Sequence, residues 1–151
     1  MKVGIIGTGL MGFPMAINIA KKFDLKAFNR TFEKMRDLEK YKITLCNTLE
    51  SLSEDTDVII SMLPGDKEVI ETINQIKNFI KSGTTFIDMS STKVSTANEC
   101  YKVLKERNIN FIDAPVSGGP EGAKSGSLAI MAGGDEDTFL KVQNVLETMG
   151  N

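Results

Sequence analysis

The chain has 151 residues, of which 41% are hydrophobic and 25% charged, so it is long enough for one soluble domain with a substantial core. Its net charge of -2 argues against nucleic-acid partners, and no apolar run approaches the roughly 20 residues of a membrane span. The lack of histidine excludes Ser-His-Asp and Cys-His catalysis. Cys46 and Cys100 are isolated, which suggests neither disulfides nor a metal site. With no signal-peptide pattern, the expected location is the cytoplasm.

Strand and helix patterns alternate along the chain. They predict one α/β domain over residues 1–151, with a doubly wound, mostly parallel sheet of the Rossmann type and helices on both faces. The expected strands are 2–6, 25–29, 44–46, 58–61, 84–89 and 110–113, and a further apolar run spans 128–132. The expected helices are 11–23, 32–41, 67–81, 95–107 and 135–148.

The first strand leads into the turn Gly7-Thr8-Gly9-Leu10-Met11-Gly12, which has the G-x-G-x-x-G spacing and opens a helix. Gly7 permits the tight turn, Gly9 lets a pyrophosphate approach the backbone, and Gly12 lets helix and strand pack closely. The helix points its free N–H groups and positive dipole end at the phosphates. The context predicts a dinucleotide site, with a glycine turn in a nucleotide-free domain as the alternative.

The end of the second strand bears on which dinucleotide binds. An NAD-binding domain usually carries an acidic residue there for the ribose 2′-hydroxyl. Here Asn29 takes that place, Arg30 supplies a guanidinium fork suited to phosphate, and Thr31 adds a hydroxyl and a backbone N–H. The trio favours NADP over NAD. The alternative is that Thr31 only caps the next helix and that Arg30 is solvated.

Three loops follow the carboxyl ends of later strands, where ligands bind in such sheets: residues 61–65, 89–92 and 113–119. In the first, Leu63 and Pro64 form either a rigid apolar wall or an ordinary turn. The serines of the second either hold the nicotinamide ribose or carboxamide or cap a helix. In the third, Ser117-Gly118-Gly119 places a hydroxyl beside backbone N–H groups that would bind a carboxylate, which favours ligand contact over pure turn chemistry.

Over its whole length the chain resembles the NADP-binding half of the β-hydroxyacid dehydrogenase family, which includes 3-hydroxyisobutyrate and 6-phosphogluconate dehydrogenases. The matching stretches are VGIIGTGLMGFPMAINI at 3–19, FNRT at 28–31, SMLP at 61–64, FIDMSS at 86–91 and DAPVSGGPEGAKSGSLAIMAGG at 113–134. The resemblance implies reversible hydride transfer between NAD(P) and a short β-hydroxyacid or its semialdehyde.

The resemblance also implies roles for individual residues. The glycine turn at 7–12 would bind the pyrophosphate, and Asn29, Arg30 and Thr31 would hold the 2′-phosphate. Met62, Leu63, Pro64 and Ser91 would contact the cofactor, the last three along its nicotinamide half. Ser117, Gly118 and Gly119 would grip the substrate's carboxylate or hydroxyl.

The family's acid/base is a lysine that would fall beyond Asn151, as would the helical domain that closes the cleft and builds the dimer. We therefore expect no catalytic residue in this chain, which alone would bind NADP and catalyse poorly or not at all. A homo-oligomer or association with a helical domain is expected. The alternative function is a stand-alone, non-catalytic NADP-binding module.

Two other motifs are weaker. Tyr101 and Lys105 have the Y-x-x-x-K spacing of short-chain dehydrogenases, but an exposed helix face explains them better. Residues 118–125 approach a Walker A motif, with Ala123 where glycine is required and a strand rather than a helix expected next. A related imine or deazaflavin-linked reductase is disfavoured by the DAPVSGG stretch.

Overall fold

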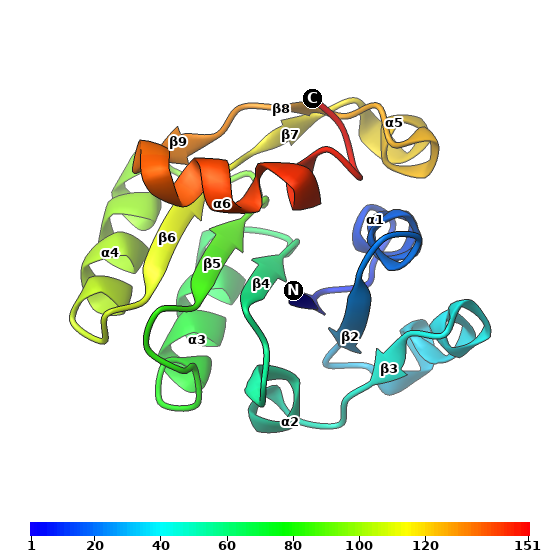
Figure 1. The fold of residues 1–151 in the computed structure, drawn as a ribbon, viewed down its shortest axis with the longest axis horizontal. Helices are drawn as coiled ribbons and strands as arrows, with labels where there is room; N and C mark the ends of the chain where they lie inside the picture. Colours follow the sequence, from blue (N-terminus) through cyan, green and yellow to red (C-terminus); the bar gives the residue numbers. More distant parts are fainter.

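The computed structural model describes residues 1–151 and contains a seven-stranded sheet with the order β3-β2-β1-β4-β5-β6-β9 (Figure 1). The strands are β1 (Lys2–Ile6), β2 (Asp24–Phe28), β3 (Thr44–Leu45), β4 (Val58–Ser61), β5 (Thr85–Asp88), β6 (Asn110–Asp113) and β9 (Gly133–Gly134). Every pair is parallel except β6 with β9. This order reverses between β1 and β4, which confirms the predicted doubly wound sheet.

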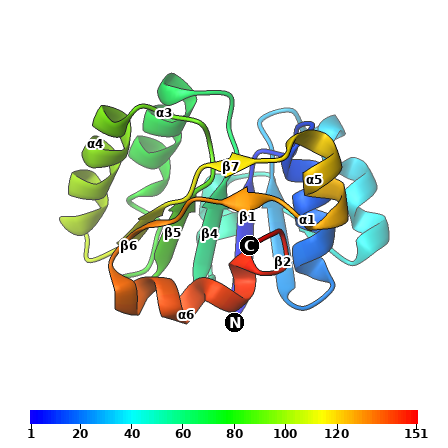
Figure 2. The same cartoon turned by 90° about the horizontal axis from the view of Figure 1, so that it is seen from above.

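Helices cover both faces of the sheet. They are α1 (Gly12–Ala20), α2 (Leu49–Ser53), α3 (Asp66–Ile76), α4 (Val94–Lys105), α5 (Gly119–Ser125) and α6 (Glu136–Leu146). Figure 2 shows α3 and α4 on one side of the sheet and α6 on the other. None of the helices combines the length and the apolarity that crossing a membrane would require.

The core consists of two apolar layers, one on each face of the sheet. Successive side chains of a strand point to opposite faces, so Ile60 and Ile87 join the layer of α1 and α6. Ile59 and Phe86 join the layer of α3 and α4, where Phe86 stacks on Phe111 with ring centroids 6.4 Å apart. Because both faces are buried, the central strands are continuous apolar runs.

The helix expected over 32–41 is wrong in type. The segment forms two 3₁₀-helices, η1 (Phe32–Lys34) and η2 (Arg36–Tyr41). The Met35 N–H bonds to the Phe32 carbonyl at 3.0 Å and the Leu38 N–H to the Met35 carbonyl at 2.9 Å. Met35 and Leu38 are the segment's buried apolar anchors, and their spacing of three residues suits a 3₁₀ turn better than a long α-helix.

The expected helix over 67–81 ends early, because α3 stops at Ile76. Val69, Ile73 and Ile76 form its buried stripe, whereas Ile70 is half-buried. Ile80 is buried as well, but it lies in a tightened turn in which the Phe79 N–H bonds to the Ile76 carbonyl at 2.8 Å. Apolar spacing therefore continued past the end of the helix.

The glycine-rich region at 113–134 contains more structure than the sequence predicted. β7 (Val116–Ser117) pairs with β8 (Ala129–Ile130) in a separate antiparallel sheet, and α5 lies between them. The expected strand at 128–132 is thus reduced to two residues outside the main sheet. α5 was not predicted because four glycines lie within 118–126, and glycine is unfavourable in helices. Pro120 in its first turn and Gly126 at its end are nevertheless residues typical of helix boundaries.

A buried side chain of α1 links this helix to α5. The Asn18 amide group, buried on α1, donates to the carbonyl oxygens of Ala123 at 2.8 Å and Lys124 at 3.4 Å. These are carbonyls at the end of α5, where a helix has no partners of its own. The glycine-rich segment is therefore fixed relative to the helix that follows the first glycine turn.

Candidate functional site

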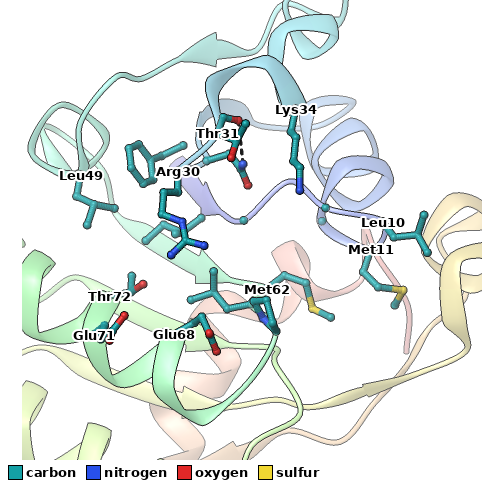
Figure 3. Close-up of a pocket in the computed structure, with 18 of the residues that line it drawn as sticks. Leu10, Met11, Arg30, Thr31, Lys34, Leu49, Met62, Glu68, Glu71 and Thr72 are labelled. Atoms are coloured by element: carbon teal, nitrogen blue, oxygen red, sulfur yellow. Dashed lines mark hydrogen bonds between the residues drawn. The ribbon is translucent and has the colours of Figure 1, made fainter.

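A cavity of about 540 Å³ opens where the strand order reverses, at the carboxyl ends of β1, β2 and β4. Figure 3 shows its lining side chains. Of the thirteen residues predicted to bind the cofactor, twelve line it: Gly7, Gly9, Leu10, Met11, Gly12, Asn29, Arg30, Thr31, Met62, Leu63, Pro64 and Ser91. Segments distant in sequence therefore converge on one cavity at the predicted edge of the sheet.

The three glycines of the first turn meet different surroundings. A Cβ atom on Gly7 would lie 2.2 Å from the Met62 carbonyl oxygen, and one on Gly12 would lie 1.9 Å from the Gly7 carbonyl oxygen. Both positions exclude a side chain because backbone packs against them. A Cβ atom on Gly9 would meet nothing within 4 Å, so only the cavity lies in front of it. This open backbone suits a bulky ligand group such as a pyrophosphate.

The start of α1 leaves its amides free for an anion. Met11, at the N-cap, makes no side-chain hydrogen bond to the helix, and the first turn contains no acidic residue. The first helix-closing bond runs from the Phe13 N–H to the Gly9 carbonyl, at 3.0 Å. A helix start with neither cap nor carboxylate presents N–H groups and a positive dipole end to whatever occupies the cavity.

Thr8 is the predicted cofactor residue that does not line the cavity. It is buried, its N–H donates to the Asn29 Oδ1 at 2.9 Å, and its hydroxyl oxygen has no hydrogen-bond partner. The Asn29 amide group also donates to the Thr31 carbonyl at 2.9 Å. Asn29 therefore joins the glycine turn to the end of β2, and a role for Thr8 in cofactor binding stays a prediction.

One end of the cavity is cationic. Arg30 extends into the cavity from the end of β2, and Lys34 reaches from η1 toward the glycine turn (Figure 3). Neither side chain forms an ion pair with a carboxylate. Glu68 and Glu71 of α3 line the opposite wall. Lys34 was not predicted, although its place four residues after Arg30 was an available signal.

The other end of the cavity is formed by the loop Met62–Pro64 after β4, with Ser91 on its exposed rim. The Met62 N–H bonds to the Ile6 carbonyl at 2.9 Å, and the Leu63 N–H bonds to the Ser90 hydroxyl oxygen at 2.9 Å. The loop is thus tied to the strands on either side of β4. The two adjacent serines have different surroundings, since Ser90 is fully buried.

A buried carboxylate lies behind this loop. Asp88, at the end of β5, is 1% exposed and accepts hydrogen bonds from the Ser61 hydroxyl at 2.8 Å and the Ser90 hydroxyl at 2.6 Å. Burial raises the pKa of Asp88, and the bonds from Ser90 and Ser61 oppose that rise. Asp88 was not among the predicted residues, although an acidic residue at the end of a buried strand was a signal.

The predicted substrate residues do not line the cavity. Ser117 is exposed on β7, and Gly118 and Gly119 turn the chain into α5 with φ of +136° and +61°. A Cβ on Gly118 would lie 3.2 Å from the Leu128 Cδ2. These positive φ values and this close contact account for the two glycines locally. A substrate role for the three residues stays a prediction.

The weaker motifs behave as ordinary structure. The Lys105 ammonium donates to the Tyr101 hydroxyl at 3.0 Å on α4, and neither residue lines the cavity. The near-Walker segment coincides with α5, and the next element is the strand β8 rather than a helix, as expected. Neither motif forms a second site.

The reversal in strand order, the glycine turn and the cavity in front of it define a dinucleotide-binding domain. Residues 2–151 match the family model described as the NAD binding domain of 6-phosphogluconate dehydrogenase. The chain belongs to the β-hydroxyacid dehydrogenase family of oxidoreductases and forms the family's NAD(P)-binding domain.

Individual relatives agree with this assignment. 2-(Hydroxymethyl)glutarate dehydrogenase of Eubacterium barkeri is 36% identical, over 99% of this chain and 51% of its own length. Mitochondrial 3-hydroxyisobutyrate dehydrogenase of Mus musculus is 35% identical, over 99% of this chain and 46% of its own. The structure of Mycobacterium tuberculosis 3-hydroxyisobutyrate dehydrogenase with L-serine superposes with a TM-score of 0.95 at 29% identity, covering 99% of this chain and 52% of that one. The chain thus spans about half the length of these relatives.

Proposed function

We propose that this chain binds NADP in preference to NAD, as the nucleotide-binding half of an oxidoreductase. That enzyme would transfer hydride between NADP(H) and a short β-hydroxyacid or semialdehyde. The observation that carries the cofactor preference is the pair of cations, Arg30 and Lys34, in a cavity that begins at an uncapped helix start. The reaction class is supported by the relatives, which are named as dehydrogenases of 2-(hydroxymethyl)glutarate and 3-hydroxyisobutyrate.

The 2′-phosphate would lie beside Arg30 and Lys34. A planar guanidinium binds two phosphate oxygens at once, and the lysine ammonium adds a second positive charge. Asn29, where NAD-binding domains carry an acid, removes the negative charge that would repel a phosphate. Glu68 and Glu71 line the opposite wall and would repel the phosphate toward the two cations.

The remaining predicted roles follow the same orientation. The amides at the start of α1 would bind the pyrophosphate, and Leu63 and Pro64 would form an apolar wall that keeps water from one side of the nicotinamide. When bound, the nicotinamide ring would accept the hydride in its oxidised form and donate it in its reduced form. Ser117 and the two glycines after it would hold the substrate carboxylate, and no residue of this chain is assigned the proton transfer.

Titration calorimetry with NADP and NAD tests the cofactor proposal. We expect NADP to bind about tenfold or more tightly than NAD at low salt, and the difference to shrink as salt is added, because the extra contacts are charge–charge. Equal affinities would contradict the preference, and no heat with either dinucleotide at millimolar concentration would contradict the site.

Assembly and location are also proposals. The family resemblance suggests association with a second copy or with a helical domain. In sedimentation velocity, either would give a sedimentation coefficient above that expected for the monomer. A cytoplasmic location rests on two buried, unpaired cysteines, which suit a reducing compartment. A steady-state assay with NADPH and small semialdehydes separates the oxidoreductase proposal from a non-catalytic binding module.

A further inference from the structure

We propose that Asp88 is a positioning residue for the nicotinamide end of the cavity, acting through Ser90 on the loop Met62–Pro64. This inference rests on the proposed binding of NADP. Asp88 does not itself line the cavity. It lies one layer behind the cavity wall, at the carboxyl end of β5, next to the strand that leads into the loop.

The direction of the hydrogen bonds supports this role. An ionised carboxylate only accepts, so the single hydroxyl proton of Ser90 points at Asp88 Oδ1, 2.6 Å away. The Ser90 Oγ is then left with its lone pairs toward the Leu63 N–H, which donates to it at 2.9 Å. Asp88 also accepts from the Ser90 backbone N–H at 3.2 Å, which fixes the residue as well as its side chain. The carboxylate therefore determines where the Leu63 amide is held.

The position of the loop matters because the glycine turn is directly against it. The Met62 carbonyl oxygen occupies the space in front of Gly7, where a Cβ atom would lie only 2.2 Å away. The Leu63 side chain is also close, at 3.1 Å from that same Cβ position. A shift of the loop would therefore change the spacing between the turn that faces the pyrophosphate and the wall that faces the nicotinamide.

A purely structural role for Asp88 predicts a different pattern. Through Ser61 the carboxylate also bonds to β4, and a link between two strands would stabilise the whole domain without favouring either end of the cavity. Loss of such a link would lower the affinity for every ligand equally, or for none. Positioning of one loop would weaken only ligands that reach that loop.

Two ligands separate these roles. NADPH spans the whole cavity, whereas adenosine 2′,5′-bisphosphate carries the adenine, the 2′-phosphate and one 5′-phosphate but no nicotinamide. We would measure both affinities, and the fluorescence of bound NADPH, for wild type, Asp88→Ala, Ser90→Ala and Asp88→Asn. Thr84→Ala is the matched control, since it removes a buried hydroxyl that bonds to the Thr56 carbonyl at 3.2 Å and precedes the opposite end of β5.

We expect Asp88→Ala and Ser90→Ala each to weaken NADPH binding by about tenfold, because each removes a hydrogen bond in a chain that includes a charged acceptor. Their affinity for adenosine 2′,5′-bisphosphate should change by less than about twofold, and the emission of bound NADPH should shift toward that of free NADPH. Asp88→Asn keeps an acceptor oxygen and should recover most of the loss. Thr84→Ala should change neither affinity.

Equal weakening of both ligands in Ser90→Ala, or no weakening of either, would overturn the proposal for Asp88 while the proposed function stood. Ser90→Ala also decides the matter if Asp88→Ala does not fold. If wild type bound neither ligand, the proposed NADP site itself would fail, and this inference with it. Circular dichroism on each variant confirms that affinities are compared between folded proteins.

Discussion

Gly9 and Gly12 are two glycines of one motif that the structure separates by their neighbours. Gly9→Ala introduces a methyl group with nothing within 4 Å, so we expect a stability near that of wild type but a large loss of NADP affinity. Gly12→Ala places a Cβ 1.9 Å from the Gly7 carbonyl oxygen, so this variant should be destabilised as well. Urea unfolding and calorimetry together distinguish the two outcomes. If Gly9→Ala bound NADP like wild type, the pyrophosphate would not pass that position.

Arg30 provides a test of the cofactor preference. We expect Arg30→Gln to weaken NADP binding by about tenfold or more, with little effect on NAD, because a charge-assisted contact to the 2′-phosphate is lost. Arg36→Gln is a matched control, since Arg36 is an exposed cation nearby on η2 that does not line the cavity. Calorimetry with both dinucleotides gives the comparison. A similar loss for NADP in both variants would indicate a general charge effect rather than a contact.

Motifs in separate short segments made twelve of the cavity residues predictable. The glycine turn was recognisable from its spacing, and Arg30 was noticed because it follows the strand end at which dinucleotide-binding domains usually hold the ribose. Asp88 and Ser90 were not predictable as a pair. The bond between these two residues is local, but their contacts with Ser61 and Leu63 depend on how β4 and β5 align side by side, which no local pattern encodes.

α3 depends on its buried stripe. Ile73 is 1% exposed against the sheet, so Ile73→Ala should lower the free energy of unfolding by about 2–5 kcal/mol through lost burial and an internal cavity. The half-buried Ile70 on the same helix is the control, and its change to alanine should cost less. Chemical denaturation measures both. Equal losses would mean that α3 does not pack through the face described.

α6 begins with a charged cap that makes its stability depend on pH. The Asp135 carboxylate accepts from the Thr138 N–H at 2.9 Å, and this bond lowers the pKa of Asp135. A lowered folded-state pKa gives stability that is present above the unfolded value of about 3.9 and lost as pH falls through the folded value. Asp135→Asn keeps the cap but not the charge. Wild type should therefore have a higher melting temperature than the variant at neutral pH and lose that advantage in acid. Thermal unfolding of both proteins at the two pH values measures the difference.

Element types were predicted best where the apolar pattern was clear. The stripe of α3 and the short apolar run Val58-Ile59-Ile60 of β4 indicated helix and strand correctly. The segment at 32–41 failed because Met35 and Leu38 supply a pattern too short to separate a 3₁₀-helix from an α-helix. α5 failed because its glycines signal a loop, whereas contact with Asn18 and Leu128 stabilises it as a helix.

At the scale of the whole molecule, the doubly wound sheet followed from the alternation of strand and helix patterns together with one fingerprint turn. The same reasoning located the cavity, because ligands bind where the strand order reverses. It did not predict β7 and β9, whose two-residue pairings depend on contacts distant in sequence. Local patterns thus indicated the sheet and its helix layers, whereas these two-residue strands could be found only in the folded chain.

The sheet also ends in an unusual way on both sides. β3 and β9 are its outermost strands, each is only two residues long, and β9 consists of two glycines that run antiparallel to their neighbour. Long outer strands expose rows of unpaired amides on which other chains can assemble into fibrils. Such short outer strands offer another polypeptide few backbone groups with which to pair, so the edges of this sheet disfavour edge-to-edge aggregation.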